Sequence, residues 1–340
     1  METNQSYQSL GPGFEPENQK KSRSIPVWIF VFLLITLAAV VVSMLRFPKV
    51  FSEYKVYRLA EERMEAGETS AALEDLMEVV ERHPNSVPMI VKLIDLSMEN
   101  GYYDSAAYIF NEYLVGKDLS DSQYYRMLDY SERLDTYYNT YDALDSLFME
   151  LNETLGDTPD EEAAERYMEE LRNSLKDLLE DPSQDQTFIL YYLSMYAETR
   201  KDSYSYIKQA YDREPEFFDV RVQLGNMARG LGNLDEAEMY LNEALAKDKE
   251  DSGALRGLAI VAMLRGDLEK GLDLAKQAYD LYADGTYVRD TYLVALHVNG
   301  CSEEEAAMIT EIEELQGGLE DDTKELLADA CTLQDYYMGE

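Results

Sequence analysis

GLGNLDEAEMYLNEAL, residues 230–245, decides the fold of this chain. The stretch opens with a turn glycine and continues with small and large apolar residues at helical spacing. The same order of residue types recurs 34 positions later in RGDLEKGLDLAKQAY, residues 265–279. It also appears in EAGETSAALEDLMEVVERHP, residues 65–84. A repeat of this period indicates helix pairs that stack on one another, because a single pair cannot bury its own apolar face.

The residue types at the repeated positions have physical reasons. A small residue where two antiparallel helices cross lets them approach closely, and Leu, Tyr or Phe fills the space beside it. A glycine at the turn permits the positive φ that a tight connection requires. The turn glycines are Gly67, Gly101, Gly232, Gly266 and Gly300.

These residues resemble the tetratricopeptide repeat (TPR) family over most of residues 53–319. The resemblance implies an all-α fold, an α-solenoid of helix hairpins that binds other proteins through its concave surface. The third hairpin is expected to begin at Met127 and to continue, out of phase, through Ala143 and Leu147.

We expect six segments in the chain. They are a disordered tail (1–24), a transmembrane helix (25–45), an N-terminal TPR-like array (53–155), a bridging helix (159–181), a C-terminal TPR-like array (184–319), and a capping helix with a tail (320–340). The capping box Thr158-Pro159-Asp160-Glu161 opens the bridging helix, and Pro182 ends it. The last helix is expected over about 321–336, at the exposed end of the stack.

The segment IPVWIFVFLLITLAAVVVSML, residues 25–45, carries no charge. It is long enough to cross a bilayer and longer than the apolar region of a cleaved signal peptide. We therefore expect a single-pass anchor in the cell membrane. Lys20, Lys21 and Arg23 crowd its N-terminal side, which favours an extracytoplasmic C-terminal domain, although basic residues also flank the other side.

The formal net charge of −38 argues against nucleic acid as a partner, because phosphates would be repelled. The charge also favours a monomeric ectodomain, while oligomers through the span stay open. Cys301 and Cys331 are interpreted as free thiols, or as a bridge if the domain lies outside the cytoplasm. His83 and His297 have no partner motif. We predict no catalytic residue, no cofactor and no metal site.

The family resemblance implies that the first helix of each hairpin lines the binding surface. Asn226, Arg229 and Arg256 form a polar, partly cationic group that suits a peptide backbone or a carboxylate. The alternative is that the aromatic and Met residues at these positions pack between helices. The candidate partner-binding residues are Phe188, Tyr192, Met195, Asn226, Arg229, Arg256, Ile260 and Met263.

The predicted function is that of a membrane-tethered scaffold that binds a protein or peptide partner. The alternatives are an envelope chaperone or assembly factor for exported polypeptides, and an adaptor at the cytoplasmic face if the topology is reversed. We find no phosphate-binding loop, no nucleophile elbow and no metal-binding His pair in the sequence, so we do not expect an enzyme.

Overall fold

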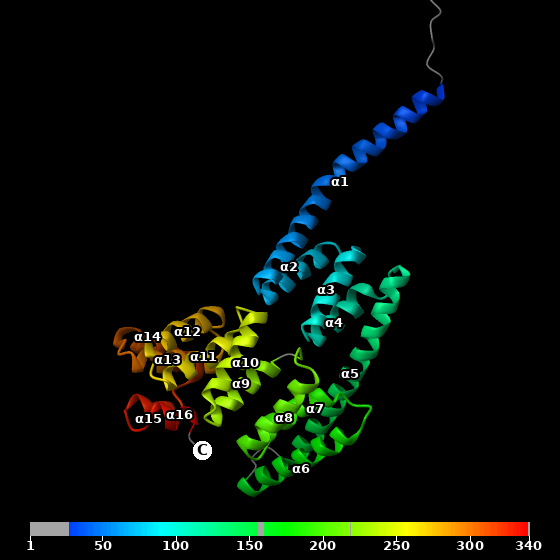
Figure 1. Cartoon of the computed structure of the whole chain (residues 1–340). Coiled ribbons are helices and arrows are strands. Elements are labelled where there is room, and N and C mark those ends of the chain that lie inside the picture. Colours follow the sequence, from blue (N-terminus) through cyan, green and yellow to red (C-terminus); the bar gives the residue numbers. More distant parts are fainter. Residues whose placement is uncertain (1–26, 156–159, 218, 339–340) are drawn as a thin grey trace, which may run out of the picture. The chain divides into compact units, whose positions relative to one another are not determined.

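The computed structural model describes residues 27–155, 160–217 and 219–338 (Figure 1). Within these ranges the chain is helical and contains no strand, so the predicted all-α class is confirmed. The chain divides into two compact units, Met1–Tyr54 and Lys55–Glu340.

The helices follow one another with short turns, and successive helices pair into hairpins. Their bounds are α1 Val27–Ala66, α2 Thr69–Arg82, α3 Val87–Glu99, α4 Tyr103–Ile109, the π-helical turn Phe110–Leu114, α5 Asp121–Leu155, α6 Glu161–Glu180, α7 Gln186–Tyr196, α8 Arg200–Arg213, α9 Val220–Gly230, α10 Leu234–Lys247, α11 Ser252–Leu264, α12 Leu268–Leu281, α13 Thr286–Val298, α14 Ser302–Gln316, α15 Asp321–Leu327 and α16 Leu333–Met338.

The first unit contains the N-terminal part of α1. The tail at 1–24 lies outside the described residues, and the apolar segment at 25–45 lies partly outside them. Phe32 and Ile35, both on α1, are 62% and 63% exposed. Among the residues that the structure describes, no helix is both long and apolar enough to cross a membrane. The structure therefore does not support the transmembrane part of the predicted fold.

Close helix packing in the second unit depends on glycines that face one leucine. Leu241 of α10 is fully buried. A Cβ atom at Gly225 of α9 would lie 2.6 Å from Leu241 Cγ, and one at Gly257 of α11 would lie 2.8 Å from Leu241 Cδ2. The repeat thus places glycine where three helices meet around a single side chain.

The second helices of successive hairpins are linked by tyrosine–glutamate hydrogen bonds. Each phenol donates to a carboxylate 32 positions later, at 2.5 to 2.9 Å. The pairs are Tyr204 with Glu236, Tyr211 with Glu243 and Tyr279 with Glu311. The near-repeat spacing shows that these tyrosines serve the stacking of hairpins.

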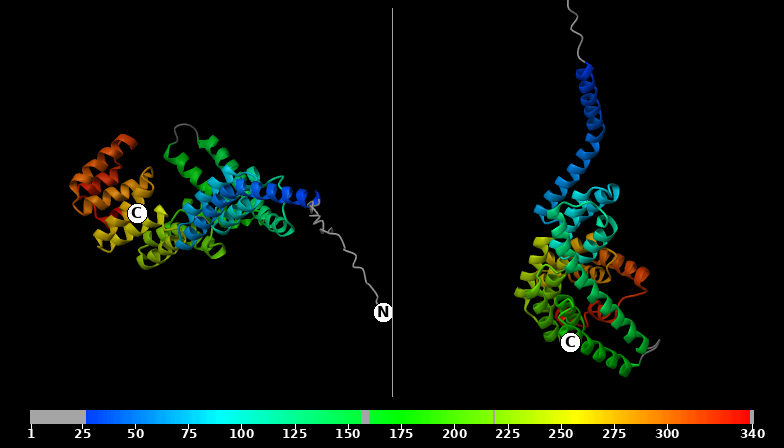
Figure 2. Two further views of the ribbon diagram at one scale, coloured as in Figure 1. Left: turned by 90° about the horizontal axis from the view of Figure 1, so that it is seen from above. Right: turned by 90° about the vertical axis from the view of Figure 1, so that its right-hand side faces the viewer.

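The expected third hairpin within residues 127–147 is wrong. Helix α5 runs without interruption from Asp121 to Leu155 and pairs with α6, as both views of Figure 2 show. The reason is local, because residues 121–155 contain no glycine or proline to open a turn. The boundaries of the two arrays and the bridge stay predictions.

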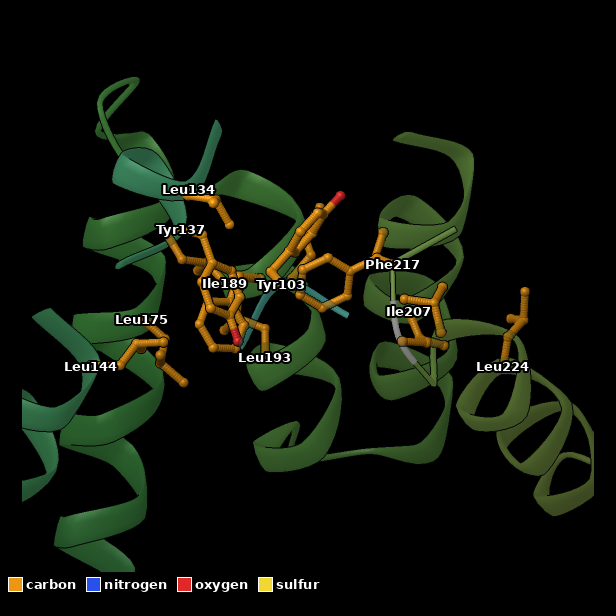
Figure 3. Packing of buried hydrophobic residues seen from close by; sticks show 14 of the residues in the cluster. Tyr103, Leu134, Tyr137, Leu144, Leu175, Ile189, Leu193, Ile207, Phe217 and Leu224 are labelled. Atoms are coloured by element: carbon orange, nitrogen blue, oxygen red, sulfur yellow. The ribbon is translucent and has the colours of Figure 1, made fainter. Parts of the chain in front are cut away.

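The largest core lies where α4 to α9 meet (Figure 3). Tyr137 of α5 stacks on Phe188 of α7 with ring centroids 4.7 Å apart. Arg133 crosses the same region, and its guanidinium lies 2.7 Å from a carboxylate oxygen of Asp185 and 2.9 Å from one of Glu214. The long hairpin of α5 and α6 is thereby fixed to α7 and to the end of α8.

A second set of contacts joins segments more than 100 residues apart within the unit Lys55–Glu340. The Lys249 amide donates to the Gly67 carbonyl at 2.7 Å, and Thr69 Oγ1 donates to the Lys247 carbonyl at 2.5 Å. Gly101 lies so close to the turn between α8 and α9 that a Cβ there would be 2.0 Å from the Glu216 carbonyl oxygen. The N-terminal hairpins therefore contact the C-terminal hairpins directly.

The expected single helix over 321–336 is also wrong. Helix α15 ends at Leu327, and Asp329 takes a left-handed conformation with φ 55°. Thr332 and Asp335 then form a capping box, in which the Thr332 amide donates to Asp335 Oδ2 and the Asp335 amide donates to Thr332 Oγ1. This box starts α16, which packs on α9 and α11. Cys331, between the two helices, is a free thiol, as is Cys301.

Candidate functional site

The structure separates the predicted partner-binding residues into two groups. Phe188, Ile260 and Met263 are 3%, 0% and 2% exposed, so they pack in the core and offer no surface to a partner. Met195 is 51% exposed at the end of α7, and Tyr192 is half-buried beside Phe188. The alternative interpretation, packing between helices, describes the first three residues.

Asn226, Arg229 and Arg256 remain accessible in part, and they lie on first helices as expected. Arg256 of α11 reaches across to α13, where its Nε donates to the Tyr287 carbonyl at 2.9 Å and lies 3.0 Å from Thr291 Oγ1. Its guanidinium also lies 5.3 Å from the centre of the Tyr287 ring. We use the name arginine groove for the surface that α9, α11 and α13 form around these residues, on which helix α16 packs.

The arginine groove contacts a segment distant in the sequence. Arg229 Nη1 donates to the Tyr337 carbonyl at 3.2 Å, and its guanidinium lies 5.7 Å from the centre of the Tyr337 ring. Arg200, at the start of α8, donates to the Met338 carbonyl at 2.8 Å and to the Gly230 carbonyl at 3.2 Å. The groove therefore already holds polypeptide main chain, supplied by α16.

The electrostatics of the arginine groove are unusual for so acidic a chain. Burial, together with the nearby charges of Arg256 and Arg200, lowers the pKa of Arg229 to about 10. Burial also lowers the pKa of Arg256. Burial raises the pKa of the Tyr337 phenol well above its ordinary value. These groups therefore lie in a site that is poorly solvated and has an excess of positive charge.

Several other arginines among the described residues are paired with acids. Arg221 lies 2.8 Å from Glu216, and Arg126 lies 3.0 Å from Asp95. Arg229 and Arg256 form no ion pair with any carboxylate among the described residues. Arginines that keep their donors free of carboxylates in a half-buried groove are suited to donate hydrogen bonds to an acceptor group of a ligand.

Sequence reasoning missed two contributors to the groove. The first is the part of α13 that contacts Arg256, namely the Tyr287 carbonyl and the Thr291 hydroxyl. The resemblance placed α13 at the binding surface, but a main-chain carbonyl leaves no pattern in the sequence. The second is the C-terminal segment, which was expected at the end of the stack but packs on α9 and α11. The capping box of Thr332 and Asp335 was the available signal that a new helix starts there.

A separate acidic cavity of about 200 Å³ lies between the N-terminal turns and α9 to α11. Its lining includes Asp219, Asp248 and Asp251, together with Tyr102 and Lys247. Burial raises the pKa of Asp251 to about 6 and that of Asp219 above its ordinary value. Within the described ranges, no group of three or more His, Cys, Asp or Glu side chains could hold a metal ion.

Comparison with known proteins places the repeat in one segment. Residues 222–286, which span α9 to the start of α13, match a family model described as tetratricopeptide repeat. No curated protein matches the chain.

Several solved structures resemble the chain weakly. A tetratricopeptide repeat protein from Parabacteroides merdae is 15% identical with a TM-score of 0.40, and the alignment covers 84% of this chain and 99% of that one. The type IV pilus biogenesis factor PilW is 13% identical with a TM-score of 0.34, covering 81% and 98%. PilF of Pseudomonas aeruginosa is 13% identical with a TM-score of 0.34, covering 83% and 99%. Likenesses this weak carry no argument about function.

The TPR resemblance is thus supported by the family model over residues 222–286, and the helix hairpins extend on both sides of that segment.

Proposed function

We propose that this chain is a scaffold that holds a segment of another polypeptide in the arginine groove. The observation that carries the proposal is the hydrogen bond from Arg229 to the Tyr337 carbonyl, because it shows a groove side chain binding main chain. The segment that matches the TPR family model, 222–286, includes α9 and α11, which supply Arg229 and Arg256.

The chemistry of the groove favours a polypeptide ligand. Guanidinium groups donate several hydrogen bonds in a fixed geometry, and main-chain carbonyls or carboxylates are suitable acceptors. Asn226 lies one turn before Arg229 on α9, but its Oδ1 is buried towards Gly257 of α11, so the two arginines supply the groove's hydrogen-bond donors. A ligand that offers acceptors, such as a peptide backbone, would satisfy these donors.

The test is proximity crosslinking in native membranes followed by mass spectrometry. The variant carries Arg229→Glu and Arg256→Glu, which reverse the charge of the groove. The control carries Lys201→Glu and Arg213→Glu, because both residues are exposed on α8 and the change in net charge is the same. We expect the groove variant to lose partners that the wild type and the control retain, with circular dichroism melts unchanged.

The pattern of captured proteins also separates the two binding functions. A scaffold retains one or two folded partners in stoichiometric amounts. An envelope chaperone or assembly factor captures many unrelated chains. Equal capture by wild type and groove variant would remove the arginine groove as the binding site.

We further propose that the apolar segment at 25–45 tethers the protein to the cell membrane, with the helical domain on the extracytoplasmic side. The support is the absence of charge in that segment and the exposure of Phe32 and Ile35. Resistance of the protein to carbonate extraction tests the tether. Added protease should digest the domain in intact cells, and protection of the domain until the cells are opened would place it in the cytoplasm.

A further inference from the structure

Helix α16 occupies the position on the arginine groove that we expect a ligand to occupy. It follows α15 in the sequence, yet it packs on α9 and α11, which precede it by several helices. Tyr337 lies against Arg229 with its ring, and the carbonyls of Tyr337 and Met338 accept from Arg229 and Arg200. The last carbonyls of a helix have no partner inside it, so the two arginines satisfy groups that would otherwise need water.

The two tyrosines of α16 have different roles. The Tyr336 hydroxyl lies 2.9 Å from Thr323 Oγ1 of α15, whereas Tyr337 faces the groove. Their rings meet edge to face with centroids 4.8 Å apart. The adjacent aromatic pair therefore holds α16 between α15 and the groove.

The attachment of α16 is weak compared with that of the other helices. It has six residues and none of them is fully buried, although Leu333, Tyr336 and Tyr337 pack partly buried against the core of α11 and α13. A helix this short does not form alone in water, so its order depends on the groove contacts and on the capping box. Segments with few buried apolar contacts open at a small fraction of the global unfolding free energy.

We propose that α16 is an intramolecular ligand that occupies the arginine groove until a partner segment of the same chemistry displaces it. That segment is a short helix ending in two adjacent aromatic residues, whose last carbonyls take the place of those of Tyr337 and Met338. This inference rests on the proposed function of the groove and adds the class of ligand and the means by which access is controlled.

The test uses a labelled, amidated peptide of residues 332–338, TLQDYYM, and the full chain. Fluorescence anisotropy measures its binding to the wild type and to Tyr337→Ala, in which α16 loses its groove contact. We expect the Tyr337→Ala chain to bind the peptide at least about tenfold more tightly than the wild type, because the internal competitor is weakened. Adding Arg229→Gln to Tyr337→Ala should abolish that binding, and a peptide with both tyrosines replaced by alanine should not bind.

A second variant leaves both tyrosines of α16 unchanged. Thr332→Ala with Asp335→Ala removes the capping box, and it should expose the groove in the same way. If Tyr337→Ala reduces the helical signal, this variant makes the same comparison.

Equal peptide binding by the wild type and both tail variants would overturn the inference, because α16 would then be a structural cap. If peptide binding is equal but the variant with Arg229→Glu and Arg256→Glu loses its crosslinked partners, this inference fails and the proposed function of the groove stands. Retention of those partners would instead overturn the proposed function, whatever the peptide does.

Discussion

Replacing Asp251 with asparagine should stabilise the protein above neutral pH. Asp251 caps α11, and its Oδ1 accepts from the Ala254 amide at 2.8 Å. It lies at the acidic cavity together with Asp219 and Asp248, and Lys247 is a basic residue of the same lining. Burial, with the charges of Asp219 and Asp248, raises its pKa from 3.8 to about 6.

The sign and size of the effect follow from linkage. A carboxyl whose pKa is raised by folding favours the folded state while it is protonated, and this contribution is lost as the pH rises through about 6. The difference between 3.8 and about 6 corresponds to about 3 kcal/mol at 1.36 kcal/mol per pKa unit. Asparagine keeps the N-cap, because it ranks with aspartate at that position, and it carries no charge.

Urea unfolding followed by circular dichroism measures this prediction. Near pH 8 we expect Asp251→Asn to be more stable than the wild type by about 3 kcal/mol, with the difference vanishing near pH 4. Asp267→Asn is the matched control, because Asp267 caps α12 in the same way and is exposed. A shift that is equal at both pH values, or a destabilised Asp251→Asn chain, would refute the electrostatic reasoning.

Three further substitutions test the packing. Gly101→Ala should destabilise the unit Lys55–Glu340 by more than Gly300→Ala, because both glycines have positive φ but only Gly101 would place its Cβ against a carbonyl, at 2.0 Å; equal changes in urea midpoint would contradict the contact. Leu241→Ala should cost about 2–5 kcal/mol, because Leu241 is fully buried between two glycines, and a loss well below about 1 kcal/mol in the same assay would show that the site collapses. Tyr279→Phe should cost about 1 kcal/mol through the lost hydrogen bond to Glu311. Burial and that bond raise the pKa of Tyr279 to about 12. The contribution of Tyr279 to the free energy of unfolding is therefore present below pH 10 and lost as the pH rises through about 12. An alkaline unfolding profile that Tyr279→Phe leaves unchanged would contradict this assignment.

Much of the fold could be predicted because it depends on contacts one repeat apart. The turn glycines, the small residues at helix crossings and the buried leucines recur at 34 positions, so each hairpin is specified by its own segment and its neighbour. The same spacing placed Arg229 and Arg256 on first helices. Where the pattern slipped, at 127–147, the absence of glycine and proline was the better guide to the continuous α5.

The residues expected to face a partner were predicted less well. Position in the repeat identifies the helix that lines the surface, but it does not show how deeply a neighbouring helix covers each side chain. Ile260 and Met263 are buried because α12 and α13 pack against α11, and that packing depends on residues of all three helices. Besides Met195 and Tyr192 on α7, the accessible part of the prediction is the polar part, Asn226, Arg229 and Arg256, which costs too much to bury without partners.

By itself the sequence determined most of the repeated helix hairpins and the acidic character of the chain, since these depend on residue types within about one repeat of each other. Only the tertiary structure decided what occupies the arginine groove and how the N-terminal turns meet the C-terminal hairpins. The contacts of Arg229 with Tyr337 and of Gly67 with Lys249 join residues more than 100 positions apart. Contacts at that distance form only when all the intervening hairpins have stacked, so no local pattern records them.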